Sequence, residues 1–222
     1  MVIIMLGAQG TGKGTIAGLI SEEMKWPQIS TGDIFRKNIS EKTELGIEAE
    51  KYIARGELVP DEITVPMVIN RLNQKDAQEG SILDGFPRTT QQAKKLDEIL
   101  EKLGKKVDLV INLSTPKEEL IDRMLTRRVC SNQECKATYN TKLHPPKVEG
   151  ICDKCGATLK QREDDSNSEA INRRLEIYEE QTSPLVEYYE AKGVLRTEVV
   201  STSINRMGKD VARVIIEDIK KN

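Results

Sequence analysis

The stretch GAQGTGKGT, residues 7–15, decides the fold, and it directly follows the apolar run VIIML at 2–6. A short apolar run, a glycine-rich turn and a helical pattern to about Met24 predict a buried strand, a loop and a helix. Four glycines between positions 7 and 14 let the backbone turn its N–H groups around an anion. Lys13 would reach the outer phosphates of a nucleotide as a point charge. The stretch predicts a phosphate-binding loop; the alternative is a glycine-rich turn without a ligand.

The loop departs at one position from the widespread pattern G-x-x-x-x-G-K-[ST], whose last hydroxyl ligates magnesium. The residue after Lys13 is Gly14, and the hydroxyl arrives one position later, at Thr15. Elsewhere in the chain, Asp84 ends the short apolar run SILD. An aspartate at a strand end near such a loop is a natural partner for the water shell of magnesium.

The composition excludes several classes of protein. Among 222 residues, 34 Lys and Arg face 36 Asp and Glu, so the net charge is −2 and the basic excess of a nucleic-acid binder is missing. The apolar run at 2–6 is too short for a signal peptide, and no segment approaches the length of a membrane span. We therefore expect a soluble cytoplasmic protein with no membrane partner.

Strand and helix patterns alternate along the chain. Besides the first strand, we expect strands at 81–84, 107–113 and 195–200. We expect helices beginning at Ser30–Asp33, at 46–55, at 61–74, from Thr89 to Gly104, from Thr115 to about Arg128, from Ser166 with an interruption at Pro184, and at 210–220. Such alternation is typical of an α/β protein with a parallel sheet. The stretch 129–163 breaks the alternation and predicts a small inserted lobe.

All four cysteines lie in that lobe, as Cys130-x4-Cys135 and Cys152-x2-Cys155 with 16 residues between the pairs. Two closely spaced pairs separated by a hairpin-sized stretch are typical of tetrahedral zinc bound by four thiolates. Four protein ligands leave no open position for a substrate, so the predicted role is structural. The alternatives are two disulfides or four free thiols, and a cytoplasmic location disfavours disulfides.

Arginines flank the lobe on both sides. Arg123 and Arg127 are four residues apart and would share one helix face, Arg162 follows the lobe, and Arg173 and Arg174 lie in the next helix. The planar fork of arginine pairs bidentately with phosphate oxygens. The arrangement is compatible with a phosphate clamp, or with a charged surface in water.

Several motifs in one order resemble the adenylate kinase family, within the nucleoside monophosphate kinases. They are GAQGTGKGT, STGD at 30–33 with Arg36, GELVPD at 56–61, DGFPR at 84–88 and the four-cysteine lobe, and the resemblance spans essentially the whole chain. It implies a P-loop parallel sheet flanked by helices, with core segments at 1–29, 60–128 and 164–222, a helical AMP-binding insertion at 30–59 and a zinc-bearing lid at 129–163. It implies magnesium-dependent, reversible phosphoryl transfer, ATP + AMP = 2 ADP, with the lid closing over the nucleotides.

The resemblance also implies individual roles. Residues implied at the donor nucleotide are Gly10, Thr11, Gly12, Lys13, Gly14, Thr15, Arg127, Thr138, Tyr139, Arg162, Arg174 and Arg206, the last near the ATP adenine. Residues implied at AMP are Thr31, Arg36, Glu57, Leu58, Val59, Gly85, Phe86, Pro87, Arg88 and Gln92. Those implied in catalysis are Lys13, Arg88, Arg123, Arg127, Arg162 and Arg174, with Asp84 organising hydrated magnesium and Cys130, Cys135, Cys152 and Cys155 holding zinc. Gln92 has a simpler alternative as a helix-capping residue.

The chain departs from the family pattern at three places. Gln9 stands where many members carry proline, and the first cysteine pair has four intervening residues in place of two. Counting forward from Arg162 selects Arg173 as the catalytic arginine, whereas counting back from RLEIY selects Arg174. We choose Arg174, because an insertion in a loop is easier than a register shift in a helix.

Two other functions remain as alternatives. A zinc lobe beside a phosphate loop is also compatible with a nucleic-acid-binding module, but the charge balance and the few aromatic groups argue against it. A kinase for UMP or CMP is the alternative within the family, against which the long lid, Thr31 and Gln92 argue. We expect a monomer whose partners are ATP, AMP and ADP.

Overall fold

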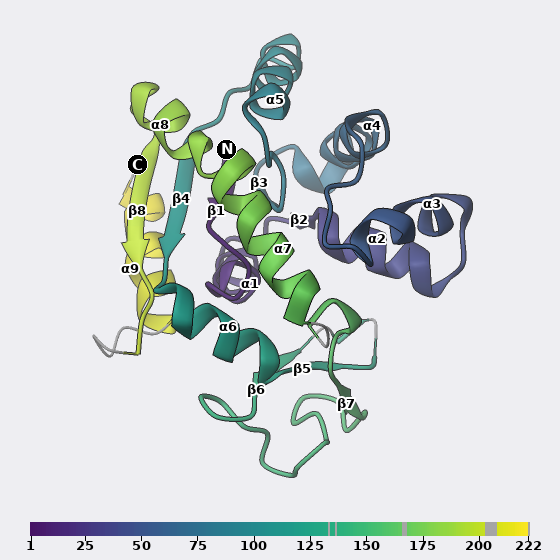
Figure 1. The fold of residues 1–222 in the computed structure, drawn as a ribbon. Helices are drawn as coiled ribbons and strands as arrows, with labels where there is room; N and C mark the ends of the chain where they lie inside the picture. Colours follow the sequence, from purple (N-terminus) through teal and green to yellow (C-terminus); the bar gives the residue numbers. More distant parts are fainter. Residues whose placement is uncertain (133, 136, 166–167, 203–207, 222) are drawn as a thin grey trace.

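A sheet of five parallel strands forms the centre of the protein, in the order β2-β3-β1-β4-β8 (Figure 1). The computed structural model describes residues 1–132, 134–135, 137–165, 168–202 and 208–221. The strands are β1 (Val2–Leu6), β2 (Gln28–Ser30), β3 (Ser81–Asp84), β4 (Leu109–Ser114) and β8 (Leu195–Val199). This confirms the predicted α/β class and parallel sheet.

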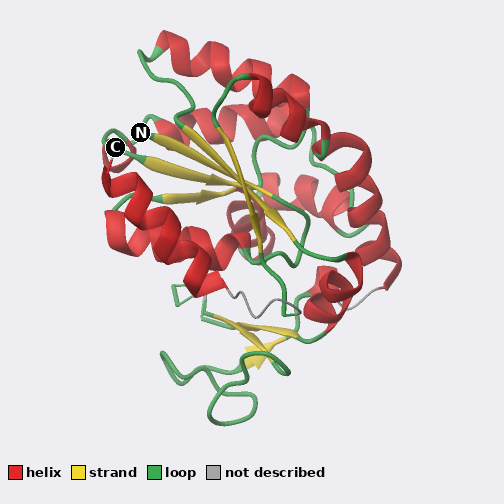
Figure 2. Cartoon of the chain, turned by 90° about the vertical axis from the view of Figure 1, so that its left-hand side faces the viewer, coloured by secondary structure: helices red, strands yellow, loops and turns green. Residues whose placement is uncertain are grey.

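Helices cover both faces of this sheet (Figure 2), because successive side chains of a strand point to opposite faces. Ile3 and Met5 pack on one face against α1 (Lys13–Met24) and α9 (Gly208–Lys221). Ile4 and its neighbours pack on the other face against α4 (Asp61–Leu72), α5 (Thr90–Lys102) and α8 (Pro184–Ala191). The central strand β1, buried on both sides, is apolar throughout, as such parallel strands usually are.

Two smaller units extend from this core. The helices α2 (Thr31–Ser40) and α3 (Glu44–Ile53) project together on one side (Figure 1), within the segment predicted as a helical insertion. A separate antiparallel sheet lies beyond the carboxyl ends of the main strands (Figure 2). It belongs to the predicted lobe, and its strands are β5 (Arg127–Cys130), β6 (Thr138–Asn140) and β7 (Leu159–Lys160). We call residues 127–163 the lid.

The remaining elements flank the lid in the sequence, except for η1, which lies between α4 and β3. They are α6 (Lys117–Leu125), α7 (Ser168–Ile177), the 3₁₀ turns η1 (Lys75–Ala77) and η2 (Glu163–Asp165), and the π-helical segment η3 (Tyr178–Thr182). The predicted interruption at Pro184 is confirmed, because α8 begins there. Among the described residues, no helix combines the length and the apolar character needed to cross a membrane.

One predicted helix start is wrong in detail. We expected Thr115 to cap a helix, but the helix begins at Lys117 with Pro116 in the cap position and no side-chain cap. The Thr115 hydroxyl instead donates to the carbonyl of Val200, at 2.7 Å. Tertiary contact with the neighbouring strand has therefore replaced local capping. The cap predicted at Thr89 is confirmed, since its hydroxyl accepts the N–H of Gln92 at 3.1 Å.

The glycine loop fits tightly against the end of β4. Gly7 has φ +131°, and a Cβ built on it would lie 2.5 Å from the carbonyl oxygen of Leu113. No other residue type fits there, because such a contact requires the backbone to move. Gly10 and Gly12 also have positive φ, and Gly12 forms the N-cap of α1. The sequence pattern of glycines thus corresponds to a turn that only glycine can make, at the carboxyl end of the central strand β1.

Candidate functional site

The site begins at the phosphate-binding loop between β1 and α1. The ammonium of Lys13 donates to two carbonyls of that loop, Gly7 at 2.6 Å and Ala8 at 2.8 Å. The Thr11 hydroxyl closes the turn by donating to Ala8, at 2.9 Å. The lysine side chain therefore lies folded over the loop, where its charge can meet an anion bound by the loop's N–H groups. Thr15, one turn along, is exposed.

Lys13 is held in a strongly perturbed environment. Burial lowers its pKa to about 8, Asp84 raises it, and Arg88, Arg127 and Arg174 lower it further. One acidic and three basic side chains from separate elements therefore act on the charge of the lysine. An anion bound among them would favour the charged form of every base.

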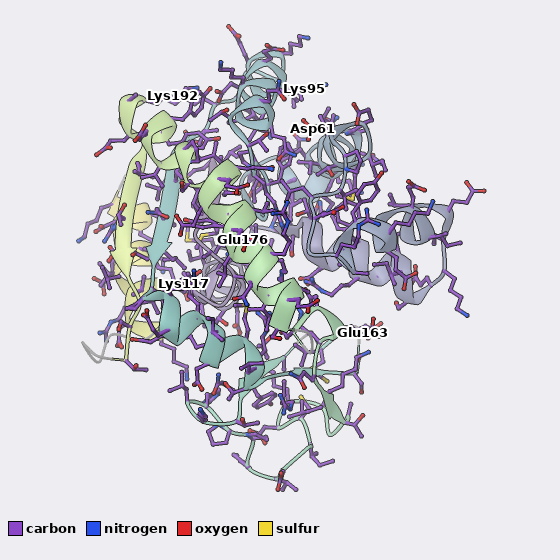
Figure 3. The ribbon with its side chains drawn as sticks, in the orientation of Figure 1. Asp61, Lys95, Lys117, Glu163, Glu176 and Lys192 are labelled. Carbon is purple, nitrogen blue, oxygen red and sulfur yellow. The ribbon has the colours of Figure 1, made fainter. Side chains whose placement is uncertain are left out.

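The basic side chains are anchored by two adjacent carboxylates at the lid's exit. Asp165 is fully buried and accepts two hydrogen bonds from Arg127, both at 2.7 Å. Asp164 accepts two from Arg162, at 3.1 and 3.0 Å. Arg174 bridges the pair, with its Nη1 3.2 Å from Asp164 and 3.3 Å from Asp165. We call these five residues the lid-base cluster; Glu163, which lies between Arg162 and Asp164 in the sequence, is labelled in Figure 3 near the start of α7.

Electrostatics keeps this cluster ionised. Burial would raise the pKa of the Asp164 carboxyl, but the guanidiniums of Arg162, Arg174 and further arginines hold it well below its usual range. Arg173 has no part in the cluster: it is half exposed and pairs with Glu176 at 3.3 Å. Of the two arginines between which the sequence left a choice, Arg174 is the one that lies in the site.

A second pair of arginines, Arg36 and Arg88, interacts electrostatically with the cluster. Arg36, on α2, pairs with Asp33, and burial together with Arg162 lowers the pKa of its guanidinium. Arg88 donates its Nε–H to the Gly85 carbonyl at 2.8 Å, and burial lowers its pKa as well. Because these groups influence one another, α2, the segment after β3 and the lid meet around one highly basic region.

Two of the other residues predicted at AMP, Thr31 and Gln92, bond to the segment that carries Arg88. The Thr31 hydroxyl donates to Gly85 O at 2.9 Å. Gln92 is buried, accepts the Arg88 N–H at 2.7 Å and donates to Asp61, labelled in Figure 3, at 2.6 Å. Its side chain therefore fixes the backbone of Arg88, a role that neither the predicted AMP contact nor the capping alternative included. Of the remaining residues predicted at AMP, Glu57 pairs with Arg55 and Leu58 is half-buried. Val59 and Phe86 are buried, and the Phe86–Pro87 peptide is cis.

Other predicted residues are not brought to the basic region. Arg123 donates to Glu119 at 2.9 Å and to the Val200 carbonyl at 3.3 Å, which places its guanidinium at the end of β8. Thr138 is exposed, and the Tyr139 ring is buried inside the lid. Arg206 lies outside the described residues.

The four lid cysteines form a compact group. Their sulfur atoms all lie within 4.8 Å of one another, with Cys130 and Cys155 at 3.4 Å and Cys135 and Cys152 at 3.7 Å, and all four are free thiols. A tetrahedron of sulfurs around zinc, with Zn–S bonds of about 2.3 Å, has edges of ~3.8 Å. The four sulfurs therefore fit a metal ion with four thiolate ligands, in spite of the longer spacing of the first pair.

The contacts of the lid-base cluster predict that substitutions at two aspartates differ greatly in their effect on the free energy of unfolding. We expect Asp165→Asn to destabilise the protein by about 3–5 kcal/mol, because buried Arg127 and Arg174 lose their shared counter-charge. The control is Asp122→Asn, since Asp122 pairs with Lys142 where both side chains are about half exposed. It should cost less than about 1 kcal/mol. Urea unfolding measures both; equal effects would contradict the assignment of Asp165 as the central counter-ion.

Comparisons with known proteins identify the family. The family model described as adenylate kinase matches residues 5–194. The chain is 49% identical over 215 residues to the adenylate kinase of Clostridium tetani, covering 97% of this chain and 98% of the relative. It is 46% identical over 215 residues to that of Caldicellulosiruptor bescii (97% and 99% covered) and 47% identical over 218 residues to that of Clostridium botulinum strain Hall (98% and 100%). On this evidence the chain belongs to the adenylate kinase family.

Proposed function

We propose that this protein transfers the terminal phosphoryl group of ATP reversibly to AMP, in the presence of magnesium, to give two ADP. The observation that carries the proposal is a group of basic side chains at the phosphate-binding loop: Arg127 and Arg174 share the buried carboxylate of Asp165, and their charges, with that of Arg88, lower the pKa of Lys13. The family relationship agrees with it. A region this basic, built from three separate segments, suits two phosphate chains that meet end to end.

The two sides of the basic region suggest that each side binds a different nucleotide. The glycine loop and Lys13 would bind the β- and γ-phosphates of ATP, since the loop's N–H groups and the start of α1 favour anions. Arg36 and Arg88, on the opposite side, would grip the AMP phosphate, while Thr31, Gln92 and residues 57–59 would line its base. Arg127, Arg162 and Arg174 would lie over the phosphoryl group as it moves.

The chemistry needs no protein nucleophile. A phosphate oxygen of AMP would attack the γ-phosphorus in line, and the bases would stabilise charge on the equatorial oxygens. The one histidine of the sequence, His144, lies in the lid, where it stacks on Tyr139. Closure of the lid and of α2–α3 would exclude water, which would otherwise accept the phosphoryl group.

Two metal ions complete the proposal. Asp84 fits a role beside hydrated magnesium, because its carboxylate ends β3 next to Gly14, where a Cβ would lie only 3.5 Å from Oδ2. Bound magnesium would neutralise charge on the phosphates. The four cysteines would hold zinc as a structural ion that replaces a core in the lid. Four free thiols suit a reducing compartment, and we place the protein in the cytoplasm.

The test of the function is a panel of acceptors. ADP formation from Mg-ATP would be measured with AMP, CMP, UMP or GMP, each against a blank without acceptor. We expect strong preference for AMP and a negligible blank, because water is excluded from the closed site. Comparable rates with CMP or UMP would move the assignment to a kinase for those monophosphates. No transfer to any acceptor would contradict the proposal.

The zinc proposal predicts a stability effect that exceeds the catalytic one. Cys152→Ser should lower the melting temperature by several degrees, because one lost thiolate weakens metal binding that stabilises the lid. Prolonged exposure of the unchanged protein to a strong chelator should do the same, and added Zn²⁺ should reverse it. The measurements are metal content and thermal unfolding in metal-replete buffer. An unchanged melting temperature after complete metal removal would contradict a structural zinc.

A further inference from the structure

Gln28 is a half-buried residue on the edge strand of the main sheet, and no sequence motif indicated a function for it. It begins the short strand β2, which pairs with β3 in a register that places Ser30 beside Asp84. Its side-chain amide donates from Nε2 to Oδ2 of Asp84, at 3.2 Å. The two residues are 56 positions apart, so only the sheet brings them together.

The same amide lies against the glycine that distinguishes this phosphate loop. A Cβ built on Gly14 would lie 3.5 Å from Asp84 Oδ2 and 3.9 Å from Gln28 Nε2. Farther along α1, a Cβ on Gly18 would lie 3.7 Å from Gln28 Oε1. The glutamine side chain thus runs along the helix face that these glycines leave bare. In the common form of the loop, a serine or threonine hydroxyl that ligates magnesium stands at position 14.

We propose that Gln28 is a positioning residue for magnesium, acting through Asp84. Its neutral amide engages Oδ2 and fixes the orientation of the carboxylate, so that Oδ1 remains for the water shell of the ion. A neutral donor suits this task, because a cation in its place would weaken the attraction of Asp84 for the metal. Outer-shell partners of metal-binding carboxylates act in this way elsewhere. The inference rests on the proposed function.

Gly14 explains why such a residue is needed here. Without a hydroxyl at position 14, the protein's hold on the ion depends on the direction of one carboxylate. Asp84 sits at the end of a strand, and its χ angles would otherwise be free to turn toward Lys13, whose charge it already meets. The hydrogen bond from Gln28 opposes that rotation.

The test compares Gln28→Met with the control Gln78→Met. Gln78 is exposed near η1, and its amide makes only long contacts: it donates to backbone carbonyls at 3.4 and 3.5 Å and accepts from Lys105 at 3.4 Å. With Gln28→Met, we expect the Mg²⁺ concentration for half-maximal activity to rise about tenfold or more and kcat to fall, with KM for AMP unchanged. With Gln78→Met, all three values should match the unchanged protein.

A binding measurement separates metal positioning from general damage. The rise in melting temperature caused by ATP is measured with EDTA and with Mg²⁺. Gln28→Met should keep the rise with ATP alone and lose the additional rise from Mg²⁺. The additional rise should also be lost in Asp84→Asn, and combining both changes should add nothing further, because the two residues act on one interaction. Should Gln28→Met fail to fold, Gln28→Leu takes its place in the same comparison.

The outcomes distinguish the inference from the function on which it rests. Unchanged Mg²⁺ dependence and an intact Mg²⁺-specific rise in Gln28→Met, with an active unchanged protein, would overturn the role of Gln28 alone. Additive effects of Gln28→Met and Asp84→Asn would overturn it as well. An unchanged protein that transfers no phosphoryl group would overturn the proposed function instead.

Discussion

The contact between Arg127 and the buried carboxylate of Asp165 is the interaction on which the rest of the site depends. Arg127 begins the strand that enters the lid, Asp165 ends the turn that leaves it, and Arg174 joins them from α7. One fully buried carboxylate therefore fastens both ends of the lid to a core helix. Because a buried charge is tolerated only when it is paired, this geometry is strongly specified. The same carboxylate holds two guanidiniums, those of Arg127 and Arg174, whose charges lower the pKa of Lys13 at the phosphate loop.

The charges of the site are not fully balanced within the protein. Six basic side chains (Lys13, Arg36, Arg88, Arg127, Arg162 and Arg174) meet four carboxylates (Asp33, Asp84, Asp164 and Asp165), which leaves an excess of two positive charges (6 − 4). Burial is the first cause of the lowered pKa of Lys13; Asp84 opposes this lowering, and the surrounding arginines add to it. Phosphate oxygens would supply the missing negative charge. Magnesium would neutralise the phosphate charge that exceeds the positive excess of the site. The site therefore suits a ligand that carries several negative charges.

Local patterns in the sequence predicted the main elements that carry this site. The strand–loop–helix around Lys13, the strand ending at Asp84 and the four-cysteine lobe each depend on residues close together in the chain. Tertiary contacts decided what the sequence could not predict. Thr115 bonds Val200 in place of capping a helix, and the three-residue strand β2 is too short to show a period, so Gln28 gave no signal. Tyr139 lies beside the cysteines because its hydroxyl accepts the Asp153 N–H, a contact inside the folded lid.

The central claim is that the basic region binds two phosphate chains at once, one on each side. A crystal structure with Mg²⁺, AMP and a non-hydrolysable analogue of ATP tests this most directly. The account predicts that Arg36 and Arg88 contact the AMP phosphate, while Lys13, Arg127, Arg162 and Arg174 contact the analogue's phosphates, with Asp165 still bonded to Arg127. Phosphates bound outside this region, or a lid-base cluster that comes apart when they bind, would contradict the account.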